Sequence, residues 1–82
     1  MSSFRFDAAA VLRAVSALAE QAVAGTISPE RKRAWAREHD NLFKFPPALE
    51  CADHIERVAK YSRTVERTVE NVLGRERVKA GW

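Results

Sequence analysis

Four basic side chains gather around one tryptophan between residues 31 and 37. Arginine and lysine can neutralise phosphates and release the counterions bound to them, which suits a nucleic-acid surface. Tryptophan and arginine are also enriched at the energetic centres of protein interfaces. This composition makes the segment a candidate binding surface, and it leaves open whether a nucleic acid or a protein would bind there. The residues are Arg31, Lys32, Arg33 and Arg37 around Trp35.

The stretch AGTISPERKRA, residues 24–34, places a glycine turn between two expected helices and invites comparison with a helix-turn-helix. The second helix of that motif must bury an apolar stripe, whereas residues 30–33 are all charged. Two nearby acids, Glu30 and Asp40, cancel part of the positive field of the arginines. We therefore interpret this segment first as a solvent-exposed helix held in place by Trp35, and keep phosphate binding as the alternative.

Metal or nucleophilic chemistry has one local candidate, the cluster of Cys51, Asp53 and His54. Cys51 and His54 lie one helical turn apart, but a structural zinc site needs two further ligands. The other histidine, His39, has no cysteine near it in the sequence, and a lone cysteine needs an adjacent base to act as a nucleophile. We interpret Cys51 as a buried core residue. The sequence thus predicts no metal site, no cofactor, no catalytic residue and no enzymatic activity.

Length and composition indicate what kind of protein must position these residues. A chain of 82 residues forms one domain near the lower limit for folding unaided. The net charge of +3 is small for a dedicated nucleic-acid binder. A single cysteine fits a reducing compartment, and Asp7, Arg13 and Glu20 interrupt the apolar runs that could form a secretory or membrane-spanning segment. We expect a cytoplasmic protein that makes no membrane contact.

Two helices are expected before residue 43. In residues 7–24 apolar side chains recur at helical spacing, and many alanines allow close packing from more than one side, so this helix is expected to be central. Asp7 suits its N-cap. The second helix, over 29–42, starts after a capping Ser28. The stretch NLFKFPP is then expected to form a buried turn that covers one end of the core with Phe43 and Phe45.

The third expected helix, over 47–73, carries an unbroken heptad seam of small and β-branched residues. At about 1.5 Å per residue it would span on the order of 40 Å, against about 27 Å for the first helix, so it would extend past its neighbour. A second copy of the chain is the simplest cover for the overhanging part, and we therefore expect a homodimer. The dimer seam is predicted to consist of Ile55, Val58, Val65, Val69 and Val72.

Residues 74–82 are expected to form a flexible basic tail, because Gly74 is expected to end the third helix. The apolar side chains there are too few to offset the backbone entropy of ordering the segment, about 1–2 kcal/mol per residue. We expect the tail to serve binding more than folding. Its candidate binding residues are Arg75, Arg77, Lys79 and Trp82.

These expectations combine into one fold class and two functional hypotheses. The fold is expected to be all-α, a small three-helix domain made of a helical hairpin and a long C-terminal helix. The chain is expected to bind a protein partner of unknown identity, as a non-enzymatic inhibitor or accessory subunit. A phage or mobile-element origin, with host nucleic-acid machinery as the target, is one hypothesis for such a protein, although no residue shows it. The alternative is a dimeric nucleic-acid-binding regulator that uses residues 31–37 and the tail.

Overall fold

Short polar side chains start the first two helices. In the computed structural model, which describes residues 7–43 and 47–80 and the side chains up to Gly74, Asp7 Oδ1 accepts a hydrogen bond from Ala10 N at 3.1 Å. Ser28 Oγ accepts one from Arg31 N, also at 3.1 Å. These caps satisfy backbone N–H groups that have no partner within their own helix. The helices are α1, Ala8–Ala24, and α2, Pro29–Glu38, which is followed by the 3-10 turn η1, Asp40–Leu42.

The single helix expected over 47–73 is instead two helices, α3, Ala48–Ser62, and α4, Val65–Ala80. The break falls at Arg63, whose φ of 67° and ψ of −15° are left-handed. Its N–H donates to Ala59 O at 3.0 Å and so caps the end of α3. Thr64 Oγ1 then accepts a hydrogen bond from Arg67 N at 3.2 Å, which starts α4 in the manner of an N-cap. The chain therefore reverses direction at residues 63–64.

The expectation that Gly74 ends a helix and opens an irregular tail is wrong over residues 74–80, where the backbone continues α4 to Ala80. Glycine inside a helix costs only about 1 kcal/mol relative to alanine, which the packing of the preceding turns can offset. The predicted binding side chains of this segment lie outside the described part of the structure. They are those of Arg75, Arg77, Lys79 and Trp82.

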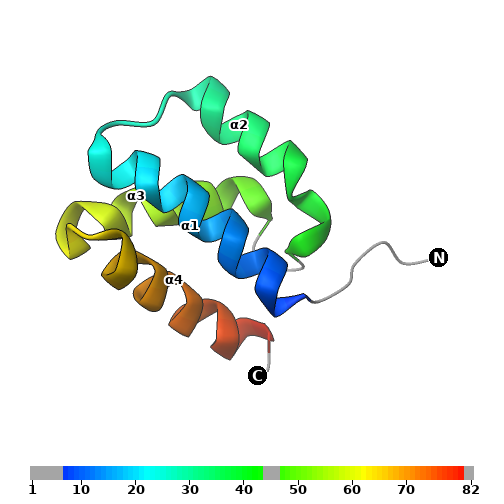
Figure 1. The fold of residues 1–82 in the computed structure, drawn as a ribbon. Helices are drawn as coiled ribbons and strands as arrows, with labels where there is room; N and C mark the ends of the chain where they lie inside the picture. The colour runs from blue at the N-terminus through cyan, green and yellow to red at the C-terminus, as the bar shows by residue number, and fades with distance from the viewer. Residues whose placement is uncertain (1–6, 44–46, 81–82) are drawn as a thin grey trace.

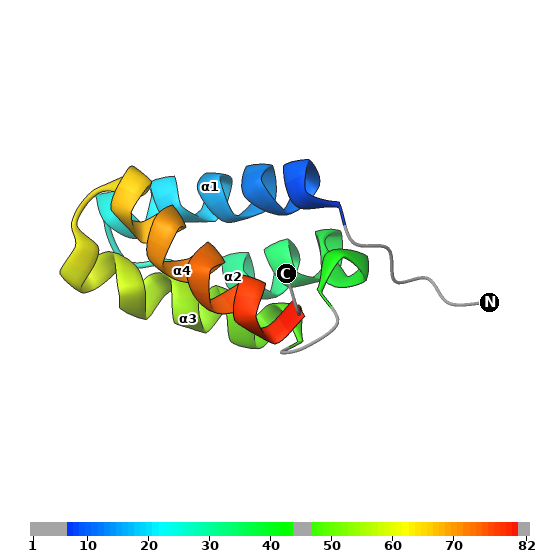
Figure 2. The same cartoon turned by 90° about the horizontal axis from the view of Figure 1, so that it is seen from below.

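Consecutive helices run in opposite directions, so α1 and α3 point one way and α2 and α4 the other (Figure 1). α3 packs against α1, α2 and α4, whereas α1 packs mainly against α3 and α4. Figure 2 shows α1 on one side of the molecule, with α3 and α4 lying beneath it. The all-α fold class is thus confirmed over the described residues, which form four α-helices in place of the expected three.

The expected dimer seam is covered within one chain. Ile55 and Val72 are completely buried, and Val58 and Val69 are nearly so. Val65 is partly buried against the same core. The overhang that suggested a second copy does not exist, because α4 folds back along α3 and the seam of one helix faces that of the other. The seam residues therefore need no second copy of the chain to cover them.

Trp35 attaches α2 to the remaining helices. Its side chain is completely buried, and its Nε1–H donates to the backbone oxygen of Ala14 in α1 at 2.9 Å. Its ring centroid lies 5.6 Å from that of Phe43 and 5.2 Å from that of His39. Phe43 is buried, as expected for the turn, whereas Phe45 lies outside the described residues. One aromatic side chain thus joins α1, α2 and the two residues that flank η1.

Candidate partner-binding surface

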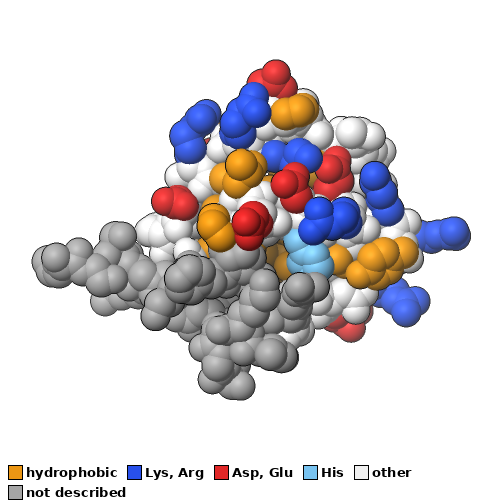
Figure 3. Space-filling model, turned by 180° about the vertical axis from the view of Figure 1, so that it is seen from behind, with side chains coloured by type: hydrophobic (Ala, Val, Ile, Leu, Met, Phe, Trp, Pro, Cys, Tyr) orange, Lys and Arg blue, Asp and Glu red, His pale blue; other side chains and the backbone are white. Residues whose placement is uncertain are grey.

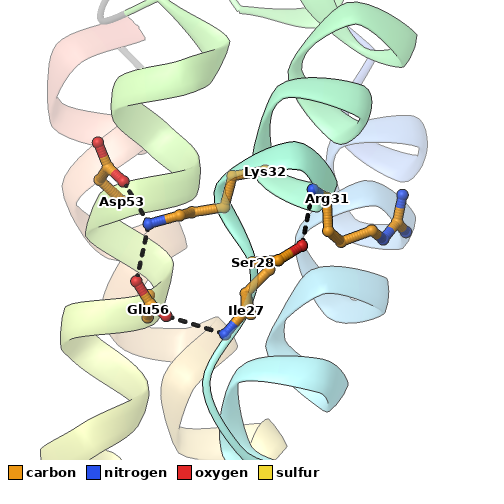
Figure 4. Close-up of polar contacts among 6 residues, drawn as sticks. All are labelled: Ile27, Ser28, Arg31, Lys32, Asp53 and Glu56. Carbon is orange, nitrogen blue, oxygen red and sulfur yellow. Dashed lines mark hydrogen bonds and ion pairs between the residues drawn. The ribbon is translucent and has the colours of Figure 1, made fainter.

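Lys32, predicted as a binding residue, forms ion pairs with another helix of the same chain. Its Nζ lies 2.9 Å from Asp53 Oδ1 and 2.9 Å from Glu56 Oε1, so α2 is joined to α3 by two ion pairs (Figure 4). The second carboxylate oxygen of Glu56 accepts a hydrogen bond from Ile27 N at 3.0 Å, in the turn between α1 and α2. We call this network the Lys32 clamp; it comprises Lys32, Asp53, Glu56 and the N–H of Ile27.

The Lys32 clamp shifts the pKa of two of its members, Lys32 and Glu56. The hydrogen bonds to Asp53 and Glu56 raise the pKa of Lys32 above 10.5. The hydrogen bonds from Lys32 and from the N–H of Ile27 lower the pKa of Glu56 below 4.5. The side chains of Lys32 and Glu56 are only 16% and 15% exposed. Their charges are therefore committed to each other and offer little to a partner.

The other basic residues of α2 divide into two kinds. Arg31 is partly buried; its Nη1 lies 3.6 Å from Glu38 Oε1, and its Nε donates to Gln21 Oε1 at 3.0 Å. Arg33 and Arg37 are exposed one turn apart on the outer side of α2. The predicted cluster is therefore split, and two of its four bases remain available to a partner.

A second set of bases surrounds the turn between α3 and α4. Figure 3 shows basic side chains gathered around a large hydrophobic one at the edge of the molecule where α3 ends. Tyr61 is 68% exposed, the largest value among the exposed large apolar side chains. Among the described side chains, the bases of this set take part in none of the ion pairs. We call this set the corner surface; its exposed residues are Arg57, Lys60, Tyr61, Arg63 and Arg67.

Charge is only partly balanced around the corner surface. Residues 56–67 contain four bases and two acids. One of the acids, Glu56, belongs to the Lys32 clamp. The other, Glu66, is exposed in the first turn of α4, where a carboxylate is favoured by the helix dipole. The remaining field at this end of the molecule is positive.

The backbone at Arg63 has a left-handed conformation that is unusual for a residue other than glycine. A left-handed C-cap is usually glycine, because a Cβ in this conformation costs roughly 1–2 kcal/mol. Arg63 is the non-glycine residue with a positive φ among the residues described. Strained positions of this kind concentrate at functional sites. A charged side chain is thus placed at the turn at some cost in stability.

A hollow of about 310 Å³ opens beside the corner surface. It lies between the end of α1, the turn after it and the end of α3. Lys60 and Arg63 belong both to its lining and to the corner surface. The other lining residues are Ala22, Val23, Gly25, Thr26, Glu56 and Ala59.

The structure also places the residues that the sequence offered for metal chemistry. No three or more His, Cys, Asp or Glu side chains there are grouped so that they could hold a metal ion. Cys51 is buried in the core, as expected. Among the helices described, none is both long and apolar enough to cross a membrane.

Comparison with protein families, with curated proteins and with solved structures gives no match to this chain. The candidate surface is therefore inferred from the geometry of this structure alone. No binding role was predicted for the bases between residues 57 and 67. A usable signal was present: Arg57, Lys60 and Tyr61 are spaced to lie on one helical face. Arg63 and Arg67 join this set because the chain reverses direction at residues 63–64, and the unbroken heptad pattern did not predict that turn.

Proposed function

We propose that this protein is a non-enzymatic binding protein that docks an acidic protein partner on the corner surface. The observation that carries the proposal is a set of four exposed bases around an exposed tyrosine. These four bases take part in none of the ion pairs formed by the described side chains. Tyrosine and arginine are enriched at the energetic centres of interfaces. Complementary charge speeds the encounter of partners and disfavours like-charged competitors. A small helical domain with such a surface suits an inhibitor or accessory subunit.

The docking site can be tested by reversing its charge. The full chain, tagged and incubated with nuclease-treated lysate of its native host, is expected to retain its partner at moderate salt. The double variant Arg57→Glu, Arg67→Glu should lose that partner. The matched control Arg33→Glu, Arg37→Glu changes the same number of exposed arginines on α2 and should keep it. Retention by the corner variant, with circular dichroism showing that both variants are folded, would contradict the proposal.

Nucleic-acid binding is the second candidate function, and the exposure of both Arg33 and Arg37 favours it. Such binding should weaken steeply with salt, with a slope of about −0.9 per phosphate neutralised on duplex DNA. The variant Arg33→Ala, Arg37→Ala should then lower both the affinity and the slope. Nuclease-sensitive capture that depends on these two arginines would favour this candidate over the first.

Self-association stays a prediction. Its original motive is lost, because the seam residues are buried within one chain. Light scattering over a micromolar concentration series tests it directly. A mass that stays monomeric would remove the dimer from the proposal and would leave partner docking unaffected.

A further inference from the structure

The chain passes from α3 to α4 in one tight turn, and the apolar pattern of the two helices continues through it (Figure 1). We propose that this turn opens into helix at high protein concentration, so that α4 of each chain packs on α1 and α3 of a second copy. The product is a domain-swapped dimer in which two chains exchange α4. This inference goes beyond the proposed function, and partner docking does not depend on it.

The turn has the features of a hinge that favours exchange. It consists of two residues, Arg63 and Thr64. Arg63 has a φ of 67°, a left-handed conformation in which its Cβ crowds the following carbonyl oxygen. A right-handed helical conformation at Arg63 relieves this strain once in each chain. Short hinges under strain are the ones that invite domain swapping.

The local sequence allows the hinge to become helical. Residues 62–65 are Ser, Arg, Thr and Val, without glycine or proline. Arg63 N donates to Ala59 O and Thr68 N to Thr64 O, both at 3.0 Å, and these bonds already have the spacing of an α-helix. The capping bond from Arg67 N to Thr64 Oγ1 would be replaced by one from Arg67 N to Arg63 O. The hinge therefore opens with its backbone hydrogen bonds satisfied.

The packing of α4 can be supplied equally well by a second copy. α4 packs against α1 and α3, and its side chains Val69, Val72 and Leu73 are buried there. It is joined to the other described helices through the turn at residues 63–64. Exchange of α4 therefore reproduces the same apolar contacts between two chains and needs no new apolar surface. The cost is the lost freedom of association, which a high protein concentration offsets.

One contact across the hairpin reports which chain supplies α4. Asn71 Nδ2 donates to Ser62 Oγ at 2.9 Å, so these two side chains meet within one chain in the monomer and between chains after exchange. The test uses the full chain with Ser62→Cys and Asn71→Cys, and with Cys51→Ala to remove the native thiol. The reduced protein is refolded at millimolar concentration, separated by size-exclusion chromatography, diluted and oxidised. Each fraction is then run on a denaturing gel without reductant.

The dimer fraction should give covalent dimers, and the monomer fraction should give covalent monomers only. The matched control, Asn71→Cys with Cys51→Ala, should give no covalent dimer. A dimer fraction that yields only internally linked monomers would mean that the copies associate through their surfaces, and this result would overturn the exchange. A chain that stays monomeric at millimolar concentration would overturn it as well, and would leave partner docking unaffected.

Two hinge variants test the same inference without a covalent link. Arg63→Gly should raise the dissociation constant of the dimer by about tenfold or more, because glycine adopts the closed turn without strain and disfavours the open helix. Arg63→Ala removes the same charge but keeps the Cβ, and should change the constant by no more than about threefold, since alanine and arginine form helix almost equally well. Sedimentation equilibrium measures both values. Equal weakening by the two variants would show that the charge of Arg63, and not the hinge, holds the dimer together, and would overturn the proposal.

Discussion

The Lys32 clamp and the corner surface use the same residue types for different purposes. In the clamp, one lysine is paired with two carboxylates, and the side chains of Lys32 and Glu56 are mostly buried. At the corner, around the end of α3 and the start of α4, four bases are exposed and take part in none of the ion pairs among the described side chains. Charge that is paired across helices stabilises the fold, whereas charge left exposed is available for recognition.

The comparison shows why a run of bases is a poor guide to function. The densest run, Arg31 to Arg33, contains the lysine of the clamp and an arginine held by Gln21 and Glu38. The bases of the corner are dispersed through residues 57–67 and attract little notice in the sequence. The partners that neutralise a charge come from elsewhere in the chain, and only the fold identifies them.

The largest effect should come from removing the residue that seats α2 and its clamp. Trp35→Ala deletes a completely buried ring and its hydrogen bond to Ala14 O. Core substitutions of this kind cost about 3–5 kcal/mol, most of the stability of a small domain. We expect thermal unfolding at or below room temperature by circular dichroism. A cooperative transition close to that of the wild type would mean that α2 contributes little to the fold.

The next effect separates the two regions directly. Lys32→Ala leaves two carboxylates without their cation and should lower the free energy of unfolding by about 1–2 kcal/mol. Arg67→Ala at the corner should change it by no more than about 0.5 kcal/mol, as for other surface positions. Urea unfolding of the two variants measures both values. Equal losses would remove the distinction between a structural and an available base.

A smaller effect of opposite sign is expected at Arg63. Arg63→Gly relieves the left-handed cap and should raise the unfolding free energy by about 1 kcal/mol. Differential scanning calorimetry would show this as a rise in melting temperature of about 4–8 °C. The same variant should bind the partner more weakly, because it removes a base from the corner. Arg63→Ala, which keeps the Cβ, is the control for the backbone effect. A more stable variant that keeps full affinity would show that Arg63 is not used in docking.

The smallest effect is the pH dependence of the Lys32 clamp. The pKa of Glu56 is lowered in the folded state, so its contribution is present above pH 4.5 and is lost as pH falls through the lowered pKa. The pKa of Lys32 is raised, so its contribution is present below pH 10.5 and is lost as pH rises through the raised pKa. Glu56→Gln should therefore be less stable than the wild type at neutral pH, and the difference should shrink in acid. A difference in melting temperature that stays constant from neutral pH into acid would contradict this role of the ionised Glu56 carboxylate.

Much of the helical architecture follows from local signals in the sequence. Asp7 and Ser28 cap α1 and α2, and the buried faces follow helical spacing, because caps and periodicity act over a few residues. The exceptions are Arg63 and Gly74. Arg63 occupies a left-handed cap, a conformation that non-glycine residues disfavour, whereas Gly74 lies inside a helix. Both positions depart from their local preference, and the sequence pattern therefore predicted one long helix ending at Gly74.

The candidate surface was less predictable than the fold. Lys32 is separated from Asp53 by 21 residues and from Glu56 by 24. No local pattern links such distant positions, so the clamp could not be foreseen. The heptad spacing also runs through residues 62–65 without interruption, because both arms of the α3–α4 hairpin turn their apolar sides inward. The turn that brings the corner together was hidden for that reason.

The antiparallel order of the helices has a consequence for how the protein can be mounted. The start of α1 and the end of α4 lie toward the same end of the bundle, and the α3–α4 turn lies at the other end (Figure 1). Anything joined to the chain before α1 or after α4, whether a fusion partner, an affinity tag or a solid support, would therefore be attached far from the corner surface. The corner then becomes the outward tip of the tethered molecule, and immobilised protein should capture its partner as well as protein in solution does.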